Sequence, residues 1–124
     1  MLFEMSKAYS GFSVTDVEQA EAFYRDVLGL NTSIDHGMLT LHLAGDRTTL
    51  IYPKDDHEPA SFTILNFPVP NVEEAVDALA ARGVAFVRYP GFPQDEKGIM
   101  RGHGPDIAWF TDPSGNVLSV ISEG

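Results

Sequence analysis

The chain has 124 residues, 44% of them apolar and none of them cysteine, which indicates one domain with its own core and excludes disulfide or cysteine–zinc staples. Its 18 acidic and 8 basic side chains give a formal net charge of −10 at pH 7, which opposes binding to nucleic acid or to an anionic membrane. The sequence also shows no signal-peptide pattern and no apolar run long enough to cross a membrane, so we expect a cytoplasmic protein.

A loose internal repeat organises the chain. Residues 12–22 (FSVTDVEQAEA) recur as residues 67–77 (FPVPNVEEAVD). Repetition of this kind indicates two related modules, which we place at residues 7–54 and 62–122, joined by a polar linker at residues 55–61. We expect a single domain over residues 1–124 that consists of these two βαβββ modules.

The expected elements of the first module are a strand at 8–14, a helix at 16–28 and strands at 31–35, 38–44 and 48–52. Asp16 is suited to cap the helix, and Gly29 gives a stop signal after it. Apolar and polar side chains alternate cleanly in the second of the three later strands. Gly45-Asp46 predicts a two-residue hairpin turn between the last two strands.

The expected elements of the second module are a strand at 62–69, a helix at 72–82 and strands at 84–88, 107–111 and 116–122. Asn71 is suited to cap the helix, and Gly83 to end it. Asp112-Pro113-Ser114-Gly115 predicts the last turn, because proline presets φ and glycine supplies a positive φ. Residues 89–105 are rich in proline and glycine, which is typical either of a lid at the edge of a cavity or of a plain surface loop.

Two motifs resemble those of a known superfamily. Residues 23–30 (FYRDVLGL) look like the Phe-Tyr-x-x-x-Leu-Gly-hydrophobic signature of the vicinal oxygen chelate superfamily, and residues 109–116 (WFTDPSGN) are similar to its Asp-Pro-x-Gly-Asn turn. That superfamily includes glyoxalases, bleomycin-resistance proteins and extradiol dioxygenases. The resemblance implies an α+β fold in which two tandem βαβββ modules form a cup-shaped mixed sheet with helices on its outer face, and it implies a homodimer.

The resemblance also tells where a metal would be held. In metal-dependent members, four ligands, usually His, Gln or Glu, come from the first and fourth strands of each module. The corresponding positions here are Tyr9, Ile51, Ile64 and Ser119. None of these is a usual ligand, because a divalent cation needs a lone pair or a charge at about 2.0–2.2 Å. We therefore expect no metal and no other cofactor.

Strand alternation selects the side chains that would face the cup. If Gly45-Asp46 is the turn, His42 pairs with Thr49 and Thr40 with Ile51, which puts all four on one face. Trp109 shares a face with Ser119 if the last turn has three residues, and Phe110 takes its place if the turn has four. The complete set of candidate ligand-binding residues is Tyr9, Thr40, His42, Thr49, Ile51, Ile64, Asn66, Trp109 and Ser119.

Two functions fit these residues best, beside a third possibility, an interaction module with a closed cup. The favoured one is a non-metal binding protein of the glyoxalase and bleomycin-resistance type, which holds a hydrophobic or aromatic small molecule; the negative charge would suit a cationic, antibiotic-like ligand. The alternative is a lyase or isomerase of the superfamily, either metal-free with His42 or Tyr9 as acid or base, or metal-dependent with misplaced ligands. The other histidines, His36, His57 and His103, are expected at the solvated surface.

Overall fold

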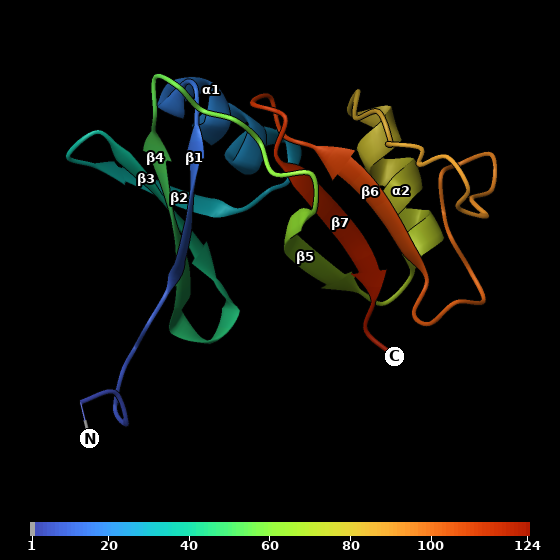
Figure 1. Ribbon diagram of the computed structural model, residues 1–124, viewed down its shortest axis with the longest axis horizontal. Helices are drawn as coiled ribbons and strands as arrows, with labels where there is room; N and C mark the ends of the chain where they lie inside the picture. Colours follow the sequence, from blue (N-terminus) through green and yellow to red (C-terminus); the bar gives the residue numbers. More distant parts are fainter. Residues whose placement is uncertain (1) are drawn as a thin grey trace. The chain divides into compact units, whose positions relative to one another are not determined.

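The computed structural model describes residues 2–124, which separate into two compact units at the bond between His57 and Glu58. This boundary falls inside the range 55–61 that the sequence predicts as a linker. The predicted α+β class is confirmed, because each unit combines one helical segment with its own mixed sheet (Figure 1). No helix within residues 2–124 is long and apolar enough to span a membrane.

The first unit has the predicted βαβββ order. Its elements are β1 (Ser10–Val14), α1 (Val17–Ala22), the π-helical segment η1 (Phe23–Val27), β2 (Asn31–Asp35), β3 (Met38–Leu43), the 3-10 turn η2 (Ala44–Asp46) and β4 (Arg47–Pro53). The sheet has the order β1-β4-β3-β2, in which β1 and β4 are parallel and the other pairs are antiparallel.

Asp16 begins the first helix as predicted, since its carboxylate accepts the Gln19 N–H at 3.0 Å. The helix then widens into η1, where the Leu28 N–H donates to the Phe23 carbonyl, and Gly29 follows with a φ of 75°. Tyr24 in η1 is fully buried. The helical segment thus supplies the apolar cover for one face of the sheet.

The predicted hairpin register between β3 and β4 is wrong by one residue. The turn holds the three residues of η2 rather than two, so Leu43 pairs with Arg47, Leu41 with Thr49 and Leu39 with Ile51. A one-residue shift moves every side chain of a strand to the opposite face of the sheet. Thr49 and Ile51 therefore lie on the same face as Leu39 and Leu41, and all four are buried.

The second unit contains β5 (Thr63–Val69), α2 (Val72–Ala81), β6 (Ile107–Thr111) and β7 (Val117–Ser122), with the sheet order β5-β7-β6. β5 and β7 are parallel, whereas β6 and β7 are antiparallel. Asn71 caps α2 as predicted, because its side chain accepts the Glu74 N–H at 3.0 Å. In Figure 1, α2 lies alongside β6 and β7.

The predicted strand at 84–88 is wrong. This segment makes only an isolated bridge between Phe86 and Phe110, with the Val87 N–H donating to the Trp109 carbonyl at 2.8 Å. The reason lies in Gln94, whose side chain accepts the Tyr89 N–H at 2.8 Å and donates to the carbonyls of Val87 and Gly98 at 2.9 Å. These backbone groups are therefore satisfied by a loop side chain instead of by a sheet ladder.

Candidate functional site

Each sheet has one face that packs against its helical segment and a second face, which we call the open face. The register of the first unit places Thr40 and His42 on the open face, as predicted, and puts Thr49 and Ile51 on the helix side. The open face of the first unit carries Gly11, Ser13, Ser33, Thr40, His42, Leu50 and Tyr52.

Two serine–histidine pairs lie on or against this open face. His42 Nε2 is 2.8 Å from Ser33 Oγ, and His57 Nδ1 is 2.6 Å from Ser13 Oγ. His42 is exposed on its strand, whereas His57, which the sequence placed at the solvated surface, is half-buried. The bond to Ser13 follows from the course of the chain after β4, and no local pattern around His57 predicts it.

Tyr9 is the least enclosed of the predicted residues. It precedes β1 and keeps 64% of its surface exposed. Strand parity places it on the same side as Gly11 and Ser13. A phenol in this setting contacts solvent more than protein.

The open face of the second unit brings three predicted residues into one row. Asn66 pairs with Ser119, and Ser119 pairs with Trp109, across the three strands of the sheet. The buried Ser119 hydroxyl donates to Asn66 Oδ1 at 2.5 Å, and the indole Nε1 of Trp109 donates to Thr63 Oγ1 at 3.1 Å. Hydroxyl, amide and indole groups are therefore fixed side by side.

The last turn explains why this row contains Trp109 and not Phe110. Thr111 pairs with Val117, so residues 112–116 form the turn, and this odd number has the same parity as a turn of three. The Asp112 carboxylate accepts the N–H groups of Ser114 and Asn116 at 2.9 and 3.0 Å and the Asn116 side-chain amide at 3.0 Å. The turn is therefore set by a buried side chain inside the DPSGN motif.

Aromatic rings from the 89–105 segment cover Trp109. Tyr89 and Phe92 pack against the indole with ring centroids 5.3 and 5.6 Å from it, and their own centroids are 5.5 Å apart. Trp109 is only 8% exposed, whereas Phe92 is 48% exposed. Tyr89 and Phe92 were not among the predicted site residues; the only signal for them is that they are aromatic residues beside prolines in this segment.

Ile64 does not continue the alternation of β5. The register shifts between Thr63 and Leu65, so that Thr63, rather than Ile64, takes the place beside Trp109. Ile64 is the unpaired residue of this irregularity, and its place in the site stays a prediction.

The four positions that carry metal ligands in the superfamily do not fit a metal. Ile51 is a buried hydrocarbon on the helix side, Ile64 has no donor atom, Tyr9 is an exposed phenol, and the Ser119 hydroxyl is engaged with Asn66. In addition, no three His, Asp or Glu side chains of residues 2–124 are grouped as metal ligands. No chemical step can be derived through a metal from this donor set.

Charged side chains hold the 95–106 part of the loop against α2. Arg101 donates to Asp95 and, at 2.9 Å, to Glu73 of the helix, while Lys97 pairs with Asp77 of the helix at 2.9 Å. Hydrogen bonds to Asp77 raise the pKa of Lys97, and those to Asp95 raise that of Arg101. These charges therefore attach a loop to a helix.

Asp95 is the centre of this attachment. Partial burial acts to raise the pKa of its carboxyl, but the N–H of Ile99, the guanidinium of Arg101 and the N–H of Lys97 outweigh burial, so the pKa lies below its usual value. Both N–H groups are 2.9 Å from Oδ1. The ionised carboxylate thus fixes residues 95–99 of the loop.

Comparison with known proteins identifies a family with this fold. Residues 8–120 match the family model of the Glyoxalase/Bleomycin resistance protein/Dioxygenase superfamily. No protein of curated function matches the chain in sequence. Many solved structures share its fold.

Three of these structures illustrate the range of proteins that share the fold. A glyoxalase family protein from Enterococcus faecalis has a TM-score of 0.70 at 20% identity, with 98% of this chain and 100% of that one covered. TnmS3, an antibiotic binding protein from Streptomyces sp. CB03234, has a TM-score of 0.67 at 23% identity, with 98% and 99% covered. The oxidase ChaP-H2 has a TM-score of 0.64 at 16% identity, with 98% and 96% covered.

At these identities the structural likeness establishes the fold, whereas the family match extends over most of the sequence. The chain belongs to the Glyoxalase/Bleomycin resistance protein/Dioxygenase superfamily.

Proposed function

We propose that the chain is a small-molecule-binding protein of the glyoxalase and bleomycin-resistance type, which holds a hydrophobic or aromatic ligand without a metal. The observation that carries this proposal is the open face of the second unit, where the rings of Tyr89, Phe92 and Trp109 lie beside the row of Asn66 and Ser119. Aromatic rings offer apolar area and stacking, and an adjacent amide orients a ligand.

A cationic ligand suits this surface best. The net charge of −10 raises the local concentration of cations, and the faces of aromatic rings attract them further. The half-exposed ring of Phe92 is the accessible member of the cluster. The antibiotic-binding protein with the same fold supports an antibiotic-like ligand as the narrower form of the proposal.

The single tryptophan of the chain provides the test, because its fluorescence reports on the cluster directly. Titration with N-methylacridinium, a planar cation, is expected to quench Trp109 saturably. Phe92→Ala and Asn66→Ala should each weaken binding about tenfold. Phe3→Ala, which removes an aromatic ring that is 80% exposed in the first unit, is the matched control and should leave the affinity unchanged. Equal affinity of all four proteins would contradict the assignment of the surface.

The metal-free part of the proposal has its own test. Metal-stripped protein is titrated with divalent cations in a thermal-shift assay, because a cation that binds only the folded chain must raise its apparent stability. We expect no saturable shift. A saturable shift with near-stoichiometric metal would reopen the metal-dependent alternative, in which the ligands are misplaced.

One observation favours a second candidate, a metal-free lyase or isomerase. His42 Nε2 lies within hydrogen-bond distance of Ser33 Oγ, which is the arrangement of a base with a fixed orientation. Tyr9, the other candidate acid or base, is largely exposed. This function predicts turnover that is lost in His42→Gln, whereas a binding protein predicts unchanged ligand affinity in that variant.

Assembly and location complete the proposal. We expect a homodimer, as the family resemblance implies, which acts in the cytoplasm without nucleic acid or membrane as a partner. The strongly negative charge supports the last part. Light scattering coupled to size-exclusion chromatography decides between one and two copies of the 13.6 kDa chain.

A further inference from the structure

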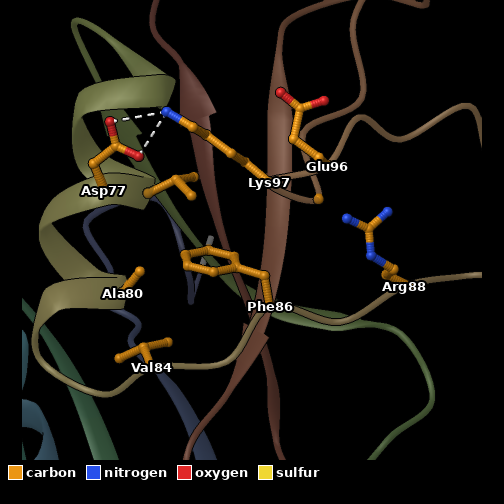
Figure 2. Close-up of a pocket in the computed structure, with 9 residues that line it drawn as sticks. Asp77, Ala80, Val84, Phe86, Arg88, Glu96 and Lys97 are labelled. Atoms are coloured by element: carbon orange, nitrogen blue, oxygen red, sulfur yellow. Dashed lines mark hydrogen bonds and ion pairs between the residues drawn. The ribbon is translucent and has the colours of Figure 1, made fainter.

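A pocket lies in the second unit, on the helix side of the sheet rather than on the open face. It has a volume of about 310 Å³ and is bounded by α2, by residues 84–88 and by residues 96–98 (Figure 2). This volume is at the lower end of the range for ligand pockets, so it suits a very small ligand.

The floor of the pocket is apolar and well supported. It is formed by Val76, Ala80, Val84 and Phe86, and the Phe86 ring stands on Phe110 of the core with centroids 5.8 Å apart. Gly98 closes one wall so tightly that a Cβ there would lie 3.2 Å from the Phe86 Cβ. A pocket with walls fixed in this way costs little ordering on binding.

The charged groups around the pocket fall into two kinds. Lys97 reaches across to Asp77 at 2.9 Å and also approaches Glu73 at 3.6 Å, so its charge is satisfied (Figure 2). Arg88 and Glu96 are exposed at the mouth, and neither makes an ion pair or a hydrogen bond with any residue from 2 to 124. In Figure 2 both side chains lie on the same side of the Phe86 ring, but no interaction joins them.

A cation and an anion that stand apart beside an apolar floor are complementary to one kind of small molecule. We propose that this pocket binds a free α-amino acid with an apolar side chain. Arg88 receives the carboxylate, Glu96 receives the ammonium group, and the side chain lies on Phe86 and its aliphatic neighbours. Charge-assisted hydrogen bonds of this type are about twice as strong as neutral ones.

The charge of the whole chain favours a zwitterion over a simple anion. A net charge of −10 repels a ligand whose only charge is a carboxylate, even though Arg88 could bind that group. A zwitterion has no net charge and is not repelled at long range. The apolar floor selects against glycine, which has no side chain to bury there, and against polar side chains, because it can offer them no hydrogen bonds.

The experiment is a titration of the ¹⁵N-labelled protein with L-phenylalanine and L-leucine, followed by amide chemical shifts. We expect saturable shifts at residues 76–80, 84–88 and 96–98, with a Kd between about 10 μM and 1 mM. Two analogues of phenylalanine with one charge each, 3-phenylpropionate and phenethylamine, should bind at least about tenfold more weakly.

Variants locate the site. Arg88→Gln and Glu96→Gln should each weaken phenylalanine binding about tenfold or more. Ala80→Leu should block binding, because the larger side chain fills the floor of the pocket. Leucine is a good helix former, so α2 should still fold. Arg47→Gln is the matched control, since Arg47 is likewise exposed and makes no ion pair with the described residues but lies in the first unit. Phe92→Ala should leave phenylalanine binding unchanged, which separates this pocket from the aromatic cluster.

Three results would overturn the proposal. One is the absence of saturable shifts up to about 10 mM amino acid, which is weaker than any useful affinity. A second is equal binding of the singly charged analogues, and a third is unchanged binding in both Arg88→Gln and Glu96→Gln. Circular dichroism of each variant confirms that it is folded before its affinity is compared.

Discussion

At the scale of single residues, Asp112 has the clearest structural role, which is to hold the turn between β6 and β7. It is 3% exposed and accepts three hydrogen bonds from the turn between β6 and β7. Asp112→Ala leaves three buried or half-buried donors without this partner and should lower the free energy of unfolding by about 2–4 kcal/mol. Urea unfolding measures the loss. Asp112→Asn, which keeps one acceptor oxygen, should lose less, and equal stability of both variants and the parent would contradict this role.

The residues whose positions the sequence predicts correctly are those with a signal close by in the chain. Asp16 and Asn71 cap their helices through bonds to an N–H three residues ahead, so the whole signal lies within four residues. The row of Asn66, Ser119 and Trp109 also follows from alternation once the parity of the turn is known. By contrast, the positions of Tyr89 and Phe92 depend on how a long loop folds, and His57 reaches Ser13 across 44 residues.

At the scale of elements, the β3–β4 hairpin shows how one residue changes a site. Gly45-Asp46 reads as a two-residue turn, but Gly45 and Asp46 adopt φ values of 73° and 58° inside a three-residue 3-10 turn. The extra residue removes Thr49 and Ile51 from the open face and adds Leu50 and Tyr52 to it. Dipeptide signals do not distinguish these two turns.

This register makes a prediction for two neighbouring residues. Ile51 is fully buried on the helix side, whereas Leu50 is half-buried on the open face. Ile51→Ala should therefore cost about 2–5 kcal/mol of unfolding free energy, and Leu50→Ala about half of that or less. Chemical denaturation of the two variants compares them directly. The reverse order of the two losses would restore the register that the sequence suggests.

The attachment of the 95–101 segment to α2 makes a prediction about pH. The pKa of Asp95 lies below its ordinary value of 3.8 in the folded chain, so its ionised form stabilises the loop fully above that value, and the stabilisation is lost as pH falls through the lowered pKa. We expect the amide shifts of Lys97 and Ile99 to change together in this acid range. Asp95→Asn removes the titrating group and should abolish the transition, so an unchanged transition in that variant would contradict the assignment.

At the scale of the whole molecule, the internal repeat predicts more than any single motif. It gives a strand followed by a capped helix in both units, and it correctly predicts the mixed α+β class. The units differ after the helix, where the first has three antiparallel-linked strands and the second replaces the first of these with a loop held by Gln94. A repeat defines what two modules share, and of the proposed ligand surface only Tyr89 and Phe92 lie in the segment where the modules diverge.

The net charge of −10 makes a prediction for the ligand. Acridine is neutral at pH 7.5 and has nearly the shape of N-methylacridinium, so the ratio of their affinities isolates the contribution of charge. At low salt the cation should bind more tightly than acridine. This advantage should fall severalfold from about 0.01 M to about 1 M salt, because the Debye length shortens from about 30 Å to about 3 Å. Fluorescence titration at several salt concentrations measures it. A ratio that does not depend on salt would show that the overall charge has no part in binding.

The central claim is that a ligand binds the aromatic cluster on the open face of the second unit. The most direct measurement is amide and indole chemical-shift mapping of the ¹⁵N-labelled protein at saturation with N-methylacridinium. Our account predicts the largest shifts at Thr63, Asn66, Tyr89, Phe92 and the indole of Trp109. Shifts centred instead on Thr40 and His42, or no saturable shifts at all, would contradict it.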